Sequence, residues 1–226
     1  MLSFGDVPED MVLVVAESQT AGRGQMSNTW ESEAGANLTF SLICHPDFVR
    51  PSEQFVISQC MAVAIWRGIA TRVDGVSIKW PNDIYIGDQK LSGTLIECDL
   101  NGKNISNCII GVGLNINQTE FHSDAPNPVS LKQVLGATLD REAILNDIVK
   151  EFITLYDRVK EGRNDDIRAE YMQHLYRKEG FHRYADVRGE FTAEIAGIEP
   201  TGHLLLRFEN GHVGRYDFKE VRFIIG

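Results

Sequence analysis

Residues 95–112, LIECDLNGKNISNCIIGV, place two apolar runs on either side of Asn101-Gly102. Asn-Gly between such runs is the strongest short hairpin signal, because both residues readily adopt positive φ. The stretch therefore predicts two antiparallel strands, Leu95–Leu100 and Ile105–Val112, within a sheet.

Strand and helix patterns extend on both sides of this hairpin. Residues 11–16, MVLVVA, form a continuous apolar run, which predicts a strand buried on both faces. Further strands are expected at 37–43, 76–79 and 84–86. Apolar residues at helical spacing predict a helix from Pro51-Ser52 to Gly68 or Gly75, and others over 130–135, 140–159 and 165–176.

The pattern changes after Gly180, where short alternating strands follow one another without a helix. They are expected at 185–188, 191–198, 203–208, 212–216 and 221–225. These strands favour a small β-barrel appended to an α/β domain. We therefore expect two domains, over residues 1–178 and 179–226.

Composition limits the function classes. The 226 residues carry 22 Lys and Arg against 32 Asp and Glu, a formal charge of −10, and 43% are apolar. This composition is that of a globular protein, and its acidic balance argues against nucleic-acid or anionic-membrane partners bound through bulk charge. The acidic N-terminus lacks the apolar core of a signal peptide, so a cytoplasmic location is expected.

The four cysteines, Cys44, Cys60, Cys98 and Cys108, include no CxxC pair. This spacing signals neither a zinc site nor a redox dithiol. We expect four buried, reduced thiols. No metal-ligand set can be assigned from the sequence.

A loop after the first strand combines glycine with arginine: Glu17-Ser-Gln-Thr-Ala-Gly-Arg-Gly-Gln25, followed by Trp30. The glycines let backbone N–H groups approach a ligand closely, and an arginine between them suits phosphate or carboxylate. A two-glycine loop is equally compatible with a plain surface turn. The loop alone leaves both interpretations open.

Two lysines lie in strand-flanking motifs. Lys79 precedes Trp80-Pro81, a rigid corner that would hold the lysine in place. Such a cation suits stabilisation of a phosphoryl group, whereas the alternative is a solvated lysine at a turn. Lys90, in Lys90-Leu-Ser-Gly93, reads on its own as a surface lysine at a hairpin entry.

Alternate glycines mark Gly111-Val-Gly113-Leu-Asn115. They remove side chains from one face of a buried strand, and Asn115 points to that same face by the period of two. Close approach of a ligand and tight sheet packing explain this pattern equally well.

Taken in order, these motifs resemble the biotin protein ligase family. The matching stretches are QTAGRGQ…W at 19–30, GANLTFSL at 35–42, KWPNDIYI at 79–86, KLSGTLIE at 90–97 and GVGLNIN at 111–117. The resemblance implies an α/β (α+β) catalytic domain on a mixed sheet, like class II aminoacyl-tRNA synthetases, and an SH3-like C-terminal domain. It also implies that ATP and biotin form biotinyl-5′-AMP with Mg²⁺, and that a lysine of a biotin carboxyl carrier protein then accepts the biotin.

The resemblance also implies roles for single residues. Lys79 and Arg23 would be the catalytic cations. Biotin would contact Gln19, Gly22, Arg23, Lys79, Gly111 and Gly113. The nucleotide would contact Arg23, Gln25, Trp30, Asn82, Lys90 and Asn115.

The chain departs from the family pattern in two places. Gln25 stands where many members carry a second arginine, so that either the adenylate is retained more weakly or the polar side chains of this segment substitute for the arginine. The family's Ser-Thr-Asn element is missing before the first strand, so we expect a shortened N-terminus. Because there is also no room for a helix-turn-helix domain, we expect a ligase without repressor activity.

Two other functions remain open. A lipoate–protein ligase would also form an acyl-adenylate intermediate. A non-catalytic biotin or nucleotide binder would hold its ligand without releasing pyrophosphate. An exposed sheet edge, finally, makes a homodimer possible.

Overall fold

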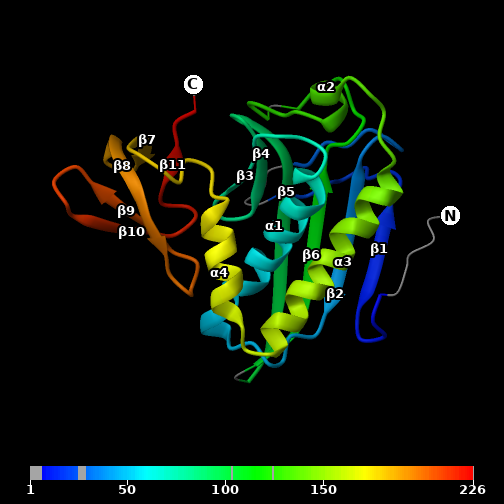
Figure 1. Ribbon diagram of the computed structural model, residues 1–226, viewed down its shortest axis with the longest axis horizontal. Helices are drawn as coiled ribbons and strands as arrows, with labels where there is room; N and C mark the ends of the chain where they lie inside the picture. The colour runs from blue at the N-terminus through cyan, green and yellow to red at the C-terminus, as the bar shows by residue number, and fades with distance from the viewer. Residues whose placement is uncertain (1–6, 25–28, 103, 124, 226) are drawn as a thin grey trace.

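The computed structural model describes residues 7–24, 29–102, 104–123 and 125–225. Its larger part is a six-stranded sheet in the order β1-β2-β6-β5-β4-β3 (Figure 1). The strands are β1 Val12–Ala16, β2 Leu38–Cys44, β3 Val76–Lys79, β4 Asp83–Ile86, β5 Gln89–Asn101 and β6 Asn104–Leu114. The predicted hairpin is confirmed, because β5 and β6 pair antiparallel up to Asn101 and Asn104 at the turn.

All of these named strands pair antiparallel. Among the described residues, parallel pairing is limited to two isolated bridges, Ile78 with Leu175 and Lys90 with Pro128. The parallel pairing in this sheet therefore comes from short segments outside the named strands, at Leu175 beside β3 and at Pro128 beside β5.

Helices cover one face of this sheet (Figure 1). The helices on this face are α1 Phe55–Ala70, α3 Arg141–Lys160 and α4 Asn164–Gln173, and the 3-10 turn η2 Pro51–Glu53 precedes α1. Helix α2, Leu131–Leu135, lies beyond the ends of the strands (Figure 1). In β2, Leu38, Phe40 and Leu42 are buried in the core, whereas the residues between them are half-buried. This alternation follows from the period of two and leaves the other face of the sheet for a site.

Strand β1 is not buried on both faces as predicted. It is the edge of the sheet, and Val12 and Val14 are each 51% exposed. The apolar run predicted the strand correctly, but helices cover only one face of it.

Helix α4 ends at Gln173, three residues before the predicted end. The following residues extend along β3 instead, since Ile78 N–H donates to His174 O and Tyr176 N–H donates to Ile78 O. Hydrogen bonding to the sheet edge replaces the last turn of the predicted helix.

The C-terminal strands form a five-stranded antiparallel sheet in the order β10-β9-β8-β7-β11. They are β7 His182–Asp186, β8 Gly189–Ile198, β9 Leu204–Phe208, β10 Val213–Tyr216 and β11 Arg222–Phe223. The indole N–H of Trp80 donates to Gly202 O at 2.9 Å, and Gly202 packs on Phe55. The closure of this sheet into a barrel and the boundary at 178/179 stay predictions.

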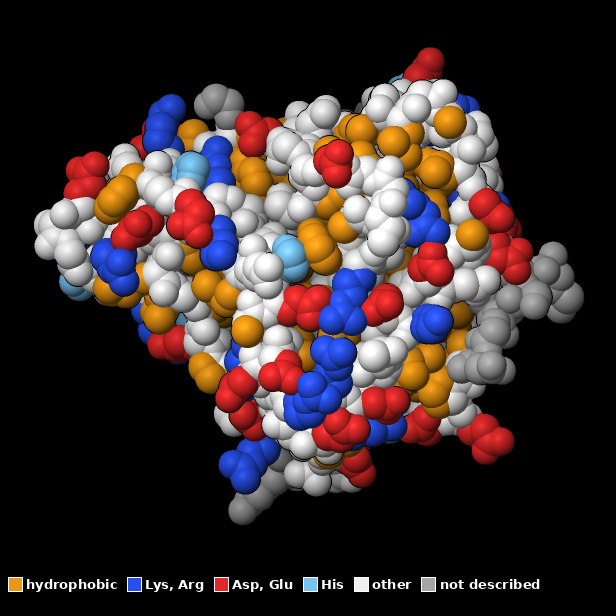
Figure 2. Space-filling model, viewed as in Figure 1, with side chains coloured by type: hydrophobic (Ala, Val, Ile, Leu, Met, Phe, Trp, Pro, Cys, Tyr) orange, Lys and Arg blue, Asp and Glu red, His pale blue; other side chains and the backbone are white. Residues whose placement is uncertain are grey.

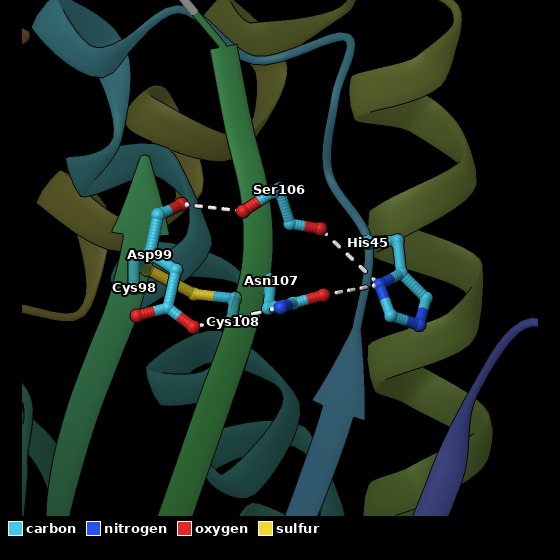
Figure 3. Close-up of a disulfide and its surroundings, with 6 residues drawn as sticks. All are labelled: His45, Cys98, Asp99, Ser106, Asn107 and Cys108. Atoms are coloured by element: carbon cyan, nitrogen blue, oxygen red, sulfur yellow. Dashed lines mark hydrogen bonds between the residues drawn. A yellow bond between two sulfur atoms is a disulfide. The ribbon is translucent and has the colours of Figure 1, made fainter. Parts of the chain in front are cut away.

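The expectation of four reduced cysteines is wrong for one pair. Cys98 and Cys108 form a disulfide, whereas Cys44 and Cys60 are free and buried. Strands β5 and β6 place these two residues directly opposite each other. Nearby, His45 Nδ1 lies 2.8 Å from Asn107 Oδ1 on β6 (Figure 3).

Charged side chains of both signs are interspersed over the helical face (Figure 2). Arg67 of α1 pairs with Glu151 of α3 and Glu170 of α4, each at 2.7 Å. These pairs link the three helices on the side opposite the open face of the sheet. None of the helices in the described residues is long and apolar enough to cross a membrane.

Candidate active site

The open face of the sheet is defined by the strand register. Thr39 and Ser41 of β2 pair with Gly113 and Gly111 of β6, which pair in turn with Gly93 and Leu95 of β5. Directly opposite residues share a face, so the glycines form a low floor between polar and apolar side chains.

A cavity of about 280 Å³ lies over this floor. The loop after β1 forms one wall through Gln19, Arg23, Gly24, Thr29 and Trp30. The sheet supplies the remaining lining residues: Thr39, Phe40, Ser41, Asp83, Lys90, Gly93, Thr94, Leu95, Glu97, Ile109, Gly111, Val112 and Gly113. Six predicted site residues therefore meet here: Gln19, Arg23, Trp30, Lys90, Gly111 and Gly113.

Two ion pairs lie in the wall of the cavity. Lys90 Nζ is 2.8 Å from Asp83 Oδ2, and these side chains are only 31% and 20% exposed. Arg23 is 3.2 Å from Glu97, with 74% and 53% of the side chains exposed. Solvent screens the second pair strongly, so Arg23 can exchange its carboxylate for an anionic ligand at little cost.

The indole of Trp30 fills the space over Gly113 and Gly93. A Cβ at Gly113 would overlap the indole, and one at Gly93 would lie 3.2 Å from Trp30 Cζ3. The indole Nε1–H is buried without a hydrogen-bond partner. The flat room predicted for biotin over Gly113 is thus occupied by an aromatic ring, whereas Gly111 remains open to the cavity.

Gly22 lies beside the cavity and is not among its lining residues. Its carbonyl accepts from Trp30 N–H at 3.0 Å, and a Cβ at Gly22 would overlap the carbonyl oxygen of Trp30. Arg23 and Thr29 form an isolated bridge in the same loop. Gly22 therefore allows the loop to close on itself, which brings Trp30 over the sheet.

Lys79 also lies outside the cavity lining. Its ammonium is 4.7 Å from the ring centroid of Phe223 on β11 and 5.4 Å from that of Tyr85 on β4. Burial lowers the pKa of Lys79, and the neighbouring carboxylate of Asp83 partly offsets this. Asn82 is buried in the turn before β4 and does not line the cavity either.

Asn115 supports the lysine that does line the cavity. Its side-chain amide donates to Val129 O at 3.1 Å, and the segment 127–129 hydrogen-bonds both the N–H and the carbonyl of Lys90. The Oδ1 atom of Asn115 is buried and has no hydrogen-bond partner. This open acceptor suits a hydroxyl donor or a cation.

One predicted residue, Gln25, lies outside the described residues. Asp83, Glu97, Thr39 and Ser41 line the cavity but were not predicted as site residues. The alternation in GANLTFSL places Thr39 and Ser41 on one face and is a signal that could have found them. In the sequence Asp83 has the pattern of a turn residue. Its contact with Lys90 is formed only by the fold, so the sequence could not reveal it.

A model of the biotin/lipoate A/B protein ligase family matches residues 5–115. The chain is 32% identical over 217 residues to the bifunctional ligase/repressor BirA of Bacillus spizizenii. This alignment covers 93% of the chain and 65% of the relative. The chain is also 29% identical to biotin–protein ligase 2 of Arabidopsis thaliana, in an alignment that covers 90% of the chain and 64% of that relative.

Solved structures show the same fold. The biotin protein ligase of Aquifex aeolicus in complex with biotin and ATP superposes with a TM-score of 0.79 at 22% identity, covering 100% of this chain and 91% of that one. The ligase of Leishmania major with biotinyl-5-AMP gives a TM-score of 0.62 at 22% identity, covering 92% and 89%. The motifs, the fold and the sequence relatives agree, and the chain carries a domain of the biotin/lipoate A/B protein ligase family.

Proposed function

We propose that the chain is an ATP-dependent biotin–protein ligase. The observation that carries the proposal is Lys90, held 2.8 Å from Asp83 in the wall of a cavity whose floor includes Gly111 and Gly113. The chain spans 65% of the length of its BirA relative, and the activity is inferred from the site together with the family.

In the first step, a biotin carboxylate oxygen attacks the α-phosphorus of ATP. The new O–P bond forms as the bond to the bridging oxygen breaks, and pyrophosphate leaves with the electron pair. Lys79, which the motif implies as the catalytic cation, is proposed to stabilise the phosphoryl charge that develops, and Lys90, which lines the cavity, to contact the nucleotide. Arg23, on the loop after β1, binds the anionic intermediate from the solvent-exposed side of the cavity.

In the second step, the neutral amine of a lysine on a biotin carboxyl carrier protein attacks the carbonyl carbon of biotinyl-5′-AMP. The C–N bond forms, the C–O bond to phosphate breaks, AMP leaves and the proton on nitrogen passes to solvent. Trp30 and its loop cover the glycine floor and exclude water that would hydrolyse the mixed anhydride.

The remaining polar groups suit orientation of the ligands. Gln19 and the hydroxyls of Thr39 and Ser41 line the cavity and provide donors and acceptors for the polar ring of biotin. Gly111 leaves room for the acyl chain. Asn115, predicted to contact the nucleotide, is buried and does not line the cavity, and it is proposed to act by holding the segment 127–129 against Lys90.

Magnesium is proposed to enter with the triphosphate. Within the residues that the structure describes, no group of three or more His, Cys, Asp or Glu could hold a metal ion. Asp83 and Asn115 offer oxygen donors of the type that Mg²⁺ prefers, alongside phosphate oxygens and water. Bound magnesium would neutralise phosphate charge.

The cellular location, the C-terminal domain and the pairing of two copies are part of the same proposal. We place the ligase in the cytoplasm, with residues 179–226 as an SH3-like domain. The edge strand β1, with Val12 and Val14 each 51% exposed, offers a surface through which two copies could pair.

The test is to incubate the purified chain with biotin, ATP and Mg²⁺ and to measure biotinyl-5′-AMP, pyrophosphate and biotinylated carrier by mass spectrometry. Lys79→Ala should abolish the adenylate and Lys90→Ala should reduce it, whereas Lys178→Ala, at a surface pair with Glu179, should do neither. Competition with lipoate separates the two ligases: preferential lipoyl-AMP would identify a lipoate ligase. Biotin binding without pyrophosphate release would indicate a non-catalytic binder.

A further inference from the structure

Glu31 follows Trp30 directly and binds a distant part of the chain. Its two carboxylate oxygens accept from the backbone N–H of His122 at 3.0 and 2.9 Å, and one of them accepts from the N–H of Ser123 at 2.6 Å. Gln118 Nε2 donates to the same carboxylate at 3.1 Å. Hydrogen bonds to an ionised acceptor are stronger than neutral ones, so the chain is firmly attached at Glu31.

Gln118 is the buried centre of this attachment. It is only 1% exposed, and its Oε1 accepts from Glu33 N–H at 3.0 Å and from Asn37 Nδ2 at 2.6 Å. Asn37, which is 3% exposed, accepts in turn from Ile116 N–H at 2.9 Å. A buried polar network whose members have partners holds one geometry, so Glu31 is attached to a rigid base.

One stretch of chain therefore meets the Trp30 region at two places. Strand β6 carries Gly113, over which the indole lies, and the chain leaving β6 carries Gln118, which binds Glu31. Because Glu31 is the next residue after Trp30, fixing Glu31 limits where the indole can lie. Glu31 is not among the residues that line the cavity, so it would act on the site through Trp30.

The carboxylate of Glu31 is charged at neutral pH. Burial opposes the charge, but the hydrogen bonds from His122 and Ser123 outweigh it, and the pKa of Glu31 lies below its usual value. Glu33, two residues further on, is exposed and meets Gln118 through its backbone N–H. Two neighbouring glutamates thus differ in how their side chains are used, which provides a matched control.

We propose that Glu31 is a positioning residue that holds Trp30 over the glycine floor and so keeps water from the acyl adenylate between the two steps. This inference rests on the proposed ligase function. Water that reaches biotinyl-5′-AMP attacks its carbonyl carbon, the C–O bond to phosphate breaks, and biotin and AMP leave. Each such hydrolysis empties the site and lets the chain use another ATP.

The measurement is pyrophosphate release with biotin, ATP and Mg²⁺ but no carrier protein. A chain that retains its adenylate releases one pyrophosphate per site and then slows, and the slow rate that follows is the leak rate. Glu31→Gln keeps the size of the side chain but turns an amide N–H₂ toward N–H donors. We expect its leak rate to rise about tenfold, as for loss of one charge-assisted interaction, and its first turnover to stay near the wild-type rate.

Two comparisons separate this role from a general loss of structure. Glu33→Gln removes the same charge from the same segment and should leave the leak rate unchanged. The Trp30→Ala/Glu31→Gln double variant should leak no faster than Trp30→Ala alone, because Glu31 acts through the indole. In the chain without ligand, the N–H of Trp30 should exchange with deuterium faster in Glu31→Gln than in wild type or Glu33→Gln.

His122 gives an independent pair of variants if Glu31→Gln does not fold. His122→Pro lacks the N–H that reaches both carboxylate oxygens and should raise the leak rate. His122→Ala keeps that N–H, and its exposed side chain is not needed, so this variant should retain the adenylate as wild type does.

Several outcomes overturn the inference. A wild-type leak rate in Glu31→Gln, an equal rise in Glu33→Gln, or losses that multiply in the double variant would each do so while the proposed function stands. A wild-type chain that releases no pyrophosphate overturns the proposed function and the role of Glu31 with it. The wild-type reaction therefore distinguishes the two failures.

Discussion

The indole of Trp30 occupies the space over Gly113 where any larger residue at position 113 would place its Cβ. The same ring covers Gly93 on the neighbouring strand, where a Cβ would be 3.2 Å from Trp30 Cζ3. The loop after β1 therefore docks on the sheet through one aromatic ring resting on two glycines. Glycine is required at position 113 for close approach rather than for an unusual dihedral angle.

Gly113→Ala should displace the indole and open the cavity to water. Overpacking of this kind costs about 1–3 kcal/mol, so Tm should fall and adenylate formation should fall with it. Gly197→Ala on β8 is the control, because its Cβ would lie 3.9 Å from Leu205 Cδ1, at ordinary contact distance. Equal melting temperatures for the two variants would show that Trp30 does not rest on Gly113.

Much of the fold is predictable because it depends on local patterns. The turn at Asn101-Gly102, the alternation in β2 and the helical spacing of α3 each belong to one segment of chain. The exposure of β1 is not predictable in this way. Whether an apolar strand is buried on one face or on both depends on which elements cover the sheet.

The site residues, too, include some that local patterns predict and others whose position depends on the fold. Gly111 and Gly113 share a face by the period of two, and the structure places both in the cavity lining. Lys79 and Lys90 each lie within a strand motif, and the sequence favours Lys79 because of its rigid Trp-Pro neighbour. Lys90 lines the cavity, and Lys79 lies against Phe223, more than 140 positions along the chain, a contact that no local pattern reports.

The junction between the sheets gives a second prediction. Gly202 has φ +95°, and a Cβ there would lie 2.8 Å from Phe55 Cδ2, whereas Gly211 has φ +82° and open space around it. Ala at either position incurs the cost of positive φ, roughly 1–2 kcal/mol. Gly202→Ala should lose about 1–3 kcal/mol more, through overpacking against Phe55. The measurement is the free energy of unfolding by urea, and equal losses would contradict the packing at the junction.

Glu97 competes with anionic ligands for Arg23. The pair is largely exposed, so its removal should change the free energy of unfolding by less than about 1 kcal/mol. Glu97→Gln should instead lower KM for ATP about two- to fivefold, because Arg23 no longer has to leave a carboxylate. Glu194→Gln, which frees Arg207 in the C-terminal sheet, should leave KM unchanged. A raised KM in Glu97→Gln would show that Glu97 assists binding.

The disulfide can be checked directly. Alkylation of the denatured, unreduced protein should label Cys44 and Cys60, with Cys98 and Cys108 linked in one peptide pair. The bond joins residues 10 apart in a hairpin already held by its turn. We therefore expect the Cys98→Ser/Cys108→Ser variant to lose about 2 kcal/mol or less. Four labelled cysteines in unreduced protein would exclude the bond.

Cys44 should make stability depend on pH in the alkaline range. Burial raises the pKa of this thiol from 9.0 to about 11, with a further contribution from Asp10. A raised pKa means that the folded protein holds the proton more tightly than the unfolded chain. The resulting stabilisation is complete below pH 9 and is lost as pH rises toward 11.

Cys44→Ala removes this titration while leaving the other groups in place. The free energy of unfolding of wild type minus that of Cys44→Ala should be constant near neutral pH. It should then shrink by on the order of 2 kcal/mol between pH 9 and 11. Urea unfolding of both proteins at each pH measures the difference. A difference that stays constant up to pH 11 would mean that the folded protein does not hold Cys44 in its protonated form.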